Sequence, residues 1–129
     1  MTATPPPARY ILVIDPEDDL RQVIALSLEI FTNWTITVAP AGHEGISLAR
    51  SLQPDAILLN ISVREVTTFS RLKAHPQTQS LPIIALVYRP FPEDRARLLG
   101  QGFAGAIALP LDTSTLHQRI ADILGWASL

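Results

Sequence analysis

The sequence contains no cysteine, which excludes a disulfide scaffold, a thiolate metal site and a cysteine nucleophile. The sequence also lacks a large excess of positive or negative charge. Ten basic and twelve acidic side chains leave a net charge of −2, so the chain as a whole has no attraction for nucleic acid or an anionic membrane. No apolar run approaches the roughly 18 residues that span a bilayer. We therefore expect a cytoplasmic protein, since a chain without cysteine is compatible with a reducing compartment.

Material for a core is abundant, because hydrophobic residues make up 47% of the 129 positions. This content excludes a disordered chain, and the length fits one domain. The first segment, MTATPPPAR, lacks the charged start and apolar stretch of a secretory signal, and its prolines favour an extended tail over residues 1–8. We expect the domain to occupy residues 9–126 and to be followed by a short tail over 127–129.

Apolar runs typical of buried strands alternate five times with segments of helical period. The expected strands are Tyr10–Ile14, Trp34–Val38, Ala56–Asn60, Pro82–Val87 and Ala104–Leu109. The expected helices are Leu20–Phe31, Ile46–Leu52, Thr67–Ala74, a segment through Leu98 to Gly100, and a last one from about Asp112 to a stop at Gly125. This alternation predicts an α/β fold in which helices cover both faces of a parallel sheet. Ligands of such sheets collect at the carboxyl ends of the strands, which here are Asp15, Ala39, Asn60, Val87 and Leu109.

Five segments in order along the chain are YILVIDPEDDLR, PDAILLNISV, LPIIALVYRP, GFAGAIALPLD and the closing helix. They resemble the landmarks of response-regulator receiver domains, and the resemblance covers residues 9–126. It implies a flavodoxin-like, doubly wound sheet with strand order 2-1-3-4-5 and a role in two-component phosphorelay signalling. A working receiver carries an acidic pair after the first strand, an aspartate ending the third, a hydroxyl residue ending the fourth and a lysine before a proline ending the fifth. These groups hold magnesium and transfer a phosphoryl group to the aspartate.

The chain departs from that pattern where the chemistry takes place. Asp15 supplies the first acid, but Pro16 stands at the second and Asn60 at the phosphoacceptor position. Val87 and Leu109 stand where the family has the hydroxyl and the lysine. An amide is a poor nucleophile and has no charge to attract magnesium. We therefore predict a pseudo-receiver that is no enzyme, uses no cofactor or Mg²⁺, and acts by protein–protein interaction without phosphorylation.

Two smaller features of the cleft, the acids after the first strand and the apolar pocket, have two interpretations each. Asp15 and Glu17 together are a candidate cation site, but we favour Asp15 as a cap of the first helix with Pro16 at its first position. The apolar pocket left by Val87 and Leu109 could take a hydrophobic ligand, but we favour a pocket filled from within. The loop after Asn60 is about three residues shorter than in the family. The Leu109-Pro110 step corresponds to one that is usually cis in receivers.

The resemblance also implies a partner surface on the fourth helix, fifth strand and fifth helix, where a signalling kinase, regulator, output protein or second copy would dock. Phe91, Arg95 and His117 are expected on or near this surface, and Ala106 replaces the family's switch aromatic. Phe91 could instead pack against the start of the fourth helix. Nucleic acid and membranes are not expected as partners.

Two other functions stay open. One is an active receiver that accepts the phosphoryl group on a substitute residue, for which Asp15 is the obvious candidate. The other is a small flavin- or nucleotide-binding protein of the same fold. We favour it least, because the loop Asp15-Pro16-Glu17-Asp18-Asp19 places four carboxylates where a phosphate requires hydrogen-bond donors.

Overall fold

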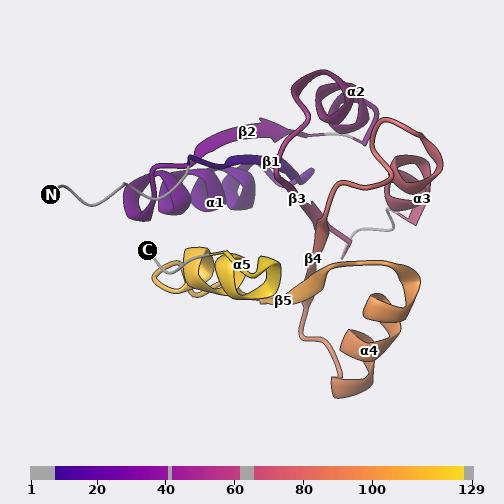
Figure 1. The fold of residues 1–129 in the computed structure, drawn as a ribbon. Helices are drawn as coiled ribbons and strands as arrows, with labels where there is room; N and C mark the ends of the chain where they lie inside the picture. The colour runs from indigo at the N-terminus through magenta and orange to yellow at the C-terminus, as the bar shows by residue number, and fades with distance from the viewer. Residues whose placement is uncertain (1–7, 41, 62–65, 127–129) are drawn as a thin grey trace, which may run out of the picture.

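The computed structural model describes residues 8–40, 42–61 and 66–126. Their centre is a five-stranded parallel sheet with the order β2-β1-β3-β4-β5 (Figure 1). Its strands are β1 (Tyr10–Ile14), β2 (Thr35–Ala39), β3 (Ala56–Asn60), β4 (Ile83–Tyr88) and β5 (Gly105–Leu109). This is the flavodoxin-like order expected from the sequence. Each predicted strand is present, with its ends shifted by at most one residue.

Five helices connect the strands in the expected alternation. They are α1 (Asp18–Phe31), α2 (Gly42–Leu52), α3 (Val66–Ala74), α4 (Pro92–Gln101) and α5 (Leu116–Leu124). Figure 1 shows α1 and α5 together on one side of the sheet and α2, α3 and α4 on the other. None of the described helices is long and apolar enough to cross a membrane.

Two hydrophobic clusters hold these layers together, one on each face of the sheet. Alternate residues of β1 serve the two clusters: Ile11 and Val13 belong to the one with α1 and α5, and Leu12 and Ile14 to the other. All five residues of β3 are buried, as in a strand covered on both faces. The strand β2 lies at an edge of the sheet and is partly exposed, in agreement with its polar threonines.

Besides α2, which begins at Gly42 rather than Ile46, two helix starts differ from the prediction by more than one residue. The last helix begins at Leu116 rather than near Asp112, because the Asp112 carboxylate accepts hydrogen bonds from the backbone N–H and the hydroxyl of Ser114. Such local side-chain bonding gives the backbone an alternative to a helix. The helix ends as expected at Gly125, whose φ of 69° is in the left-handed region that favours glycine.

The other difference concerns α1. The prediction that Asp15 caps this helix with Pro16 at its first position is wrong, because the helix begins at Asp18 and Glu17 is its N-cap. The Asp15 carboxylate instead accepts a hydrogen bond from the backbone N–H of Glu17, at 2.9 Å, in the turn that precedes the helix. Aspartate commonly bonds the backbone two residues on, and this bond delays the start of the helix.

Candidate functional site

The polar residues of the candidate site come from the carboxyl ends of two neighbouring strands. β1 and β3 pair in parallel with Ile14 opposite Leu59, so Asp15 and Asn60, the residues that follow, lie side by side. Both are completely buried. The Asn60 side-chain nitrogen donates a hydrogen bond to Asp15 Oδ1 over 3.3 Å. The two positions that the resemblance assigns to metal binding and phosphoryl acceptance are therefore joined to each other.

Burial governs the chemistry of the Asp15 carboxyl. Desolvation raises the pKa of Asp15 above its ordinary value of 3.8, and the hydrogen bonds from the Glu17 N–H and the Asn60 amide oppose this rise only in part. Oδ1 accepts both of these bonds, whereas Oδ2 is buried without a hydrogen-bond partner among the described residues. The Asp15 carboxyl therefore ionises less readily than an exposed aspartate, and it is less suited to holding a cation.

Arg21, whose charge acts on this carboxyl, forms its hydrogen bonds elsewhere. Arg21 Nη1 donates to the backbone carbonyl of Asp15 over 2.8 Å, while Nη2 pairs with the Asp18 carboxylate. The arginine therefore fixes the backbone at the end of β1 and the first turn of α1. It lowers the pKa of Asp15 slightly by its charge but forms no hydrogen bond with the Asp15 side chain within the described part of the chain.

Two of the substituted positions are apolar and belong to the core. Leu109 is 2% exposed and lies in the hydrophobic cluster that contains Leu116 and Ile120 of α5. Val87 is partly buried and packs against the cluster on the opposite face of the sheet. The Leu109-Pro110 peptide bond is cis, as the resemblance implies. These placements agree with side chains that fill the cleft from within.

The residues present do not fit a magnesium site. Mg²⁺ requires several oxygen ligands in octahedral geometry. Pro16 has no side-chain oxygen, Glu17 is exposed, and Asn60 directs its amide nitrogen at Asp15. Within the described ranges, no group of three or more His, Cys, Asp or Glu side chains could hold a metal ion. The loop whose shortening was predicted, residues 62–65, lies outside the described residues.

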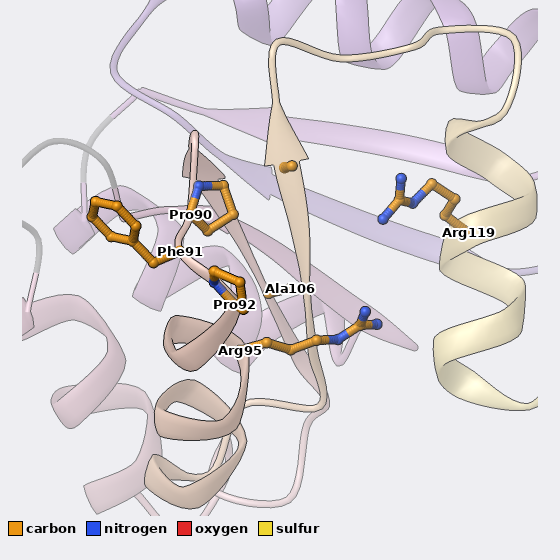
Figure 2. A pocket seen from close by; sticks show the side chains of 7 residues that line it. Pro90, Phe91, Pro92, Arg95, Ala106 and Arg119 are labelled. Atoms are coloured by element: carbon orange, nitrogen blue, oxygen red, sulfur yellow. The ribbon is translucent and has the colours of Figure 1, made fainter.

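The structure brings together three of the four residues expected at the partner surface. Phe91, Arg95 and Ala106 line one pocket of about 220 Å³, and Figure 2 shows them around the start of α4 and the strand β5. Phe91 is 69% exposed, so the alternative in which it packs against the helix is wrong. Arg119 of α5 lines the same pocket. The sequence analysis missed this residue, although it lies on the helix that the resemblance assigns to the surface.

The fourth residue, His117, lies elsewhere. Its ring stacks on Phe31 of α1, with ring centres 5.0 Å apart and planes inclined by 5°. His117 therefore belongs to the contact between α1 and α5, and it does not line the pocket with Arg95. The expectation that it shares a surface with Phe91 and Arg95 is corrected accordingly. Residues two positions apart on one helix, such as His117 and Arg119, point to opposite sides of it, and only the packing of α5 shows which side faces the pocket.

Comparison with known proteins agrees with the sheet order. The family model described as the response regulator receiver domain matches residues 11–121. The chain belongs to this family. The receiver is 31% identical over 113 residues to the uncharacterized 14.6 kDa protein in the sodA1 3′ region of Leptolyngbya boryana, covering 85% of this chain and 86% of that protein.

Some longer relatives are named as transcriptional regulators. The receiver is 26% identical over 117 residues to the DNA-binding dual master transcriptional regulator RpaA of Synechocystis, covering 88% of this chain and 48% of RpaA. It thus spans about half the length of this relative. Among solved structures, the chemotaxis response regulator CheY4 of Vibrio cholerae superposes with a TM-score of 0.79 at 20% identity, covering 91% of this chain and 99% of CheY4. At that identity the likeness shows the fold.

Proposed function

We propose that this receiver signals by docking to a protein partner without accepting a phosphoryl group. The observation that carries the proposal is Asn60, a buried amide at the phosphoacceptor position that donates a hydrogen bond to Asp15. Phosphoryl transfer to a receiver requires a carboxylate nucleophile with positive charge around the transferred group. A carboxamide supplies neither a nucleophilic oxygen nor a charge that recruits magnesium.

The surroundings of Asn60 support the same proposal. A phosphoryl group carries about −1.5 to −2 charges at neutral pH. In this cleft it would lie near the Asp15 carboxyl, with leucine at the position of the family's lysine and proline at that of its second acid. Repulsion and desolvation would then oppose the modified state, because Arg21, whose charge acts on Asp15, already bonds the Asp15 backbone carbonyl and pairs with Asp18.

Phosphorylation of Asp15 instead of Asn60 has less support. The Asp15 side chain has no exposed surface, and its Oδ1 already accepts two hydrogen bonds. A phosphodonor could reach this carboxyl only if groups that bury it moved. The flavin or nucleotide alternative is disfavoured for a different reason, because Glu17, Asp18 and Asp19 follow at the same edge of the sheet and repel phosphate.

Receiver domains interact with the kinases and output domains of signalling proteins, and we propose a partner of this kind for the chain. The candidate surface comprises α4, β5 and α5, where Phe91, Arg95 and Ala106 line the pocket. A homodimer through the same surface is a second possibility. We further propose a cytoplasmic, non-enzymatic module that binds neither nucleic acid nor membrane, in keeping with its net charge of −2.

Intact-mass spectrometry after incubation with acetyl phosphate and Mg²⁺ tests the proposal. We expect the wild-type chain to gain no phosphoryl mass. The matched control restores the family's four residues through Pro16→Asp, Asn60→Asp, Val87→Thr and Leu109→Lys, and its folded form should gain one phosphoryl mass. A gain by the wild type that disappears in Asp15→Asn would replace our proposal with the substitute-acceptor alternative.

A further inference from the structure

The pocket at the partner surface lies beside β5, which is the edge strand opposite β2. Its lining comes from the segment entering α4, from α4 itself, from the strand β5 and from the helix α5 (Figure 2). We call it the arginine pocket, and it is lined by Pro90, Phe91, Pro92, Arg95, Ala106, Ala108 and Arg119. Its volume of about 220 Å³ is below the range of roughly 300–1,000 Å³ typical of small-molecule sites. A pocket of this size suits a side chain better than a metabolite.

The floor of the arginine pocket is apolar because two alanines of β5 form it. Ala106 and Ala108 are two residues apart on a strand, so their side chains point to the same face. Ala106 is 9% exposed and Ala108 is exposed. Methyl groups leave a hollow here that an aromatic residue at position 106 would fill. Pro90 and Pro92 add apolar walls without backbone N–H groups.

The rim of the pocket is cationic. Arg95 extends from α4 and Arg119 from α5, and Figure 2 shows both side chains reaching into the space between the two helices. None of the residues that line the pocket is acidic. Positive charge is therefore concentrated here in a chain whose net charge is −2.

Two acids near the rim, Asp94 and Asp112, form hydrogen bonds with other residues. The Asp94 carboxylate accepts a hydrogen bond from the Phe91 N–H over 2.8 Å and pairs with Arg97. Asp112, which is exposed, attracts Arg119 by charge, but its carboxylate accepts hydrogen bonds from the N–H and hydroxyl of Ser114. These carboxylates neutralise the rim only in part, so it remains complementary to an anion.

We propose that the arginine pocket binds an acidic segment of a partner protein, with one apolar side chain on the alanine floor and flanking carboxylates paired with Arg95 and Arg119. The inference rests on the proposed docking function and names the chemistry of the partner. Guanidinium groups pair with carboxylates in bidentate geometry, and a central apolar anchor with a charged rim is the usual organisation of a small docking site.

The charge pattern favours a different protein over a second copy of the chain. A symmetric dimer brings the same patch of both copies together. Centred on this pocket, it would place the two arginines of one copy against those of the other. Such like-charge contact opposes association.

Fluorescence anisotropy with a labelled seven-residue peptide, leucine at its centre and three glutamates on each side, tests the inference. The wild-type receiver should bind this probe, and added salt should weaken binding. Arg95→Glu combined with Arg119→Glu should weaken it at least tenfold. Arg71→Glu, an exposed arginine of α3 outside the pocket, is the matched control and should change affinity less than twofold. Replacing the central leucine of the probe by glycine should also weaken binding at least fivefold.

Filling the floor is the second arm of the test. Ala106→Tyr should weaken binding of the probe at least fivefold, and Ala108→Tyr, at an exposed position of the same floor, gives an independent reading should the first variant not fold. The inference is overturned if the wild type does not bind the probe, or if the arginine or tyrosine variants bind it as the wild type does. It is also overturned if a polyanionic oligonucleotide or an all-glutamate peptide competes equally well, since charge alone would then explain binding.

The outcomes separate this inference from the proposed function. Failure of the probe to bind, with no phosphoryl gained from acetyl phosphate, removes the acidic partner and leaves phosphorylation-independent docking in place. Phosphoryl gain by the wild type, with normal probe binding, removes the proposed function and leaves the pocket's preference for acidic segments intact.

Discussion

Leu109→Lys tests whether the side chain at position 109 fills the cleft as part of the core or leaves room there for a lysine. It restores the residue type that working receivers carry before the proline at the end of β5. In this chain position 109 is 2% exposed and belongs to the cluster that joins the sheet to α1 and α5. The new ammonium group would therefore enter an apolar environment that the wild-type leucine occupies.

The expected cost has two parts. Full burial of a leucine side chain contributes about 1.5–3 kcal/mol, and most of this is lost if the lysine turns outward. If the ammonium stays inside, its desolvation costs several kcal/mol unless a carboxylate pairs with it. The aliphatic stem of lysine recovers part of the apolar contact by directing its charge to solvent. We expect the free energy of unfolding to fall by about 2–4 kcal/mol.

Urea denaturation followed by circular dichroism measures this change. Leu109→Met is the matched control, because a volume-conserving apolar substitution typically costs less than about 1.5 kcal/mol. If Leu109→Lys unfolds within about 0.5 kcal/mol of the wild type, the side chain at this position does not contribute to the core. The cleft would then be able to hold a lysine, and our explanation for the loss of phosphoryl chemistry would fail.

Three further predictions concern packing and charge. Gly105→Ala places a Cβ 2.7 Å from Ile123 Cγ2, so urea denaturation should show a loss of about 1–3 kcal/mol, and an unchanged midpoint would contradict this packing. Trp126→Ala removes the edge-on contact with Trp34 at 5.2 Å and should cost about 1–2 kcal/mol, whereas an oligomer contact would instead alter the elution volume in size-exclusion chromatography. Because burial raises the pKa of Asp15 above 3.8, the folded chain binds that proton more tightly than the unfolded chain, and the contribution of Asp15 to stability falls as pH rises from 3.8 through the raised pKa. Asp15→Asn should therefore gain stability relative to the wild type as pH rises above 3.8, and parallel pH profiles would refute the role of burial.

The sequence predicted the sheet well, because buried parallel strands produce continuous apolar runs that few other structures produce. Asn60 and Leu109 were placed correctly at strand ends for this reason. The starts of α1 and α5 were harder, since Asp15 and Asp112 bond nearby backbone N–H groups in turns that precede each helix. Either aspartate would serve as an N-cap by residue type alone, and propensity does not distinguish a cap from such a turn.

Contacts between helices could not be predicted from the sequence. Nothing in the spacing of α5 indicates that His117 stacks on Phe31 while Arg119, two residues on, lines the pocket with Arg95. That division depends on how α5 crosses the sheet relative to α1 and α4. The hydrogen bond that Asn60 donates to Asp15 likewise depends on strand register, which is known only when β1 and β3 are paired.

The central claim is that the cleft at Asp15 and Asn60 has lost the ability to hold a phosphoryl group. The most direct test is a two-dimensional ¹H–¹⁵N NMR spectrum recorded with and without beryllofluoride and Mg²⁺, which together mimic an acyl phosphate in its metal-bound form. The account predicts that the amide signals of Asp15, Asn60 and Val87 stay in place at millimolar concentrations of both additives. A second set of signals for these residues, growing with beryllofluoride and dependent on Mg²⁺, would contradict it.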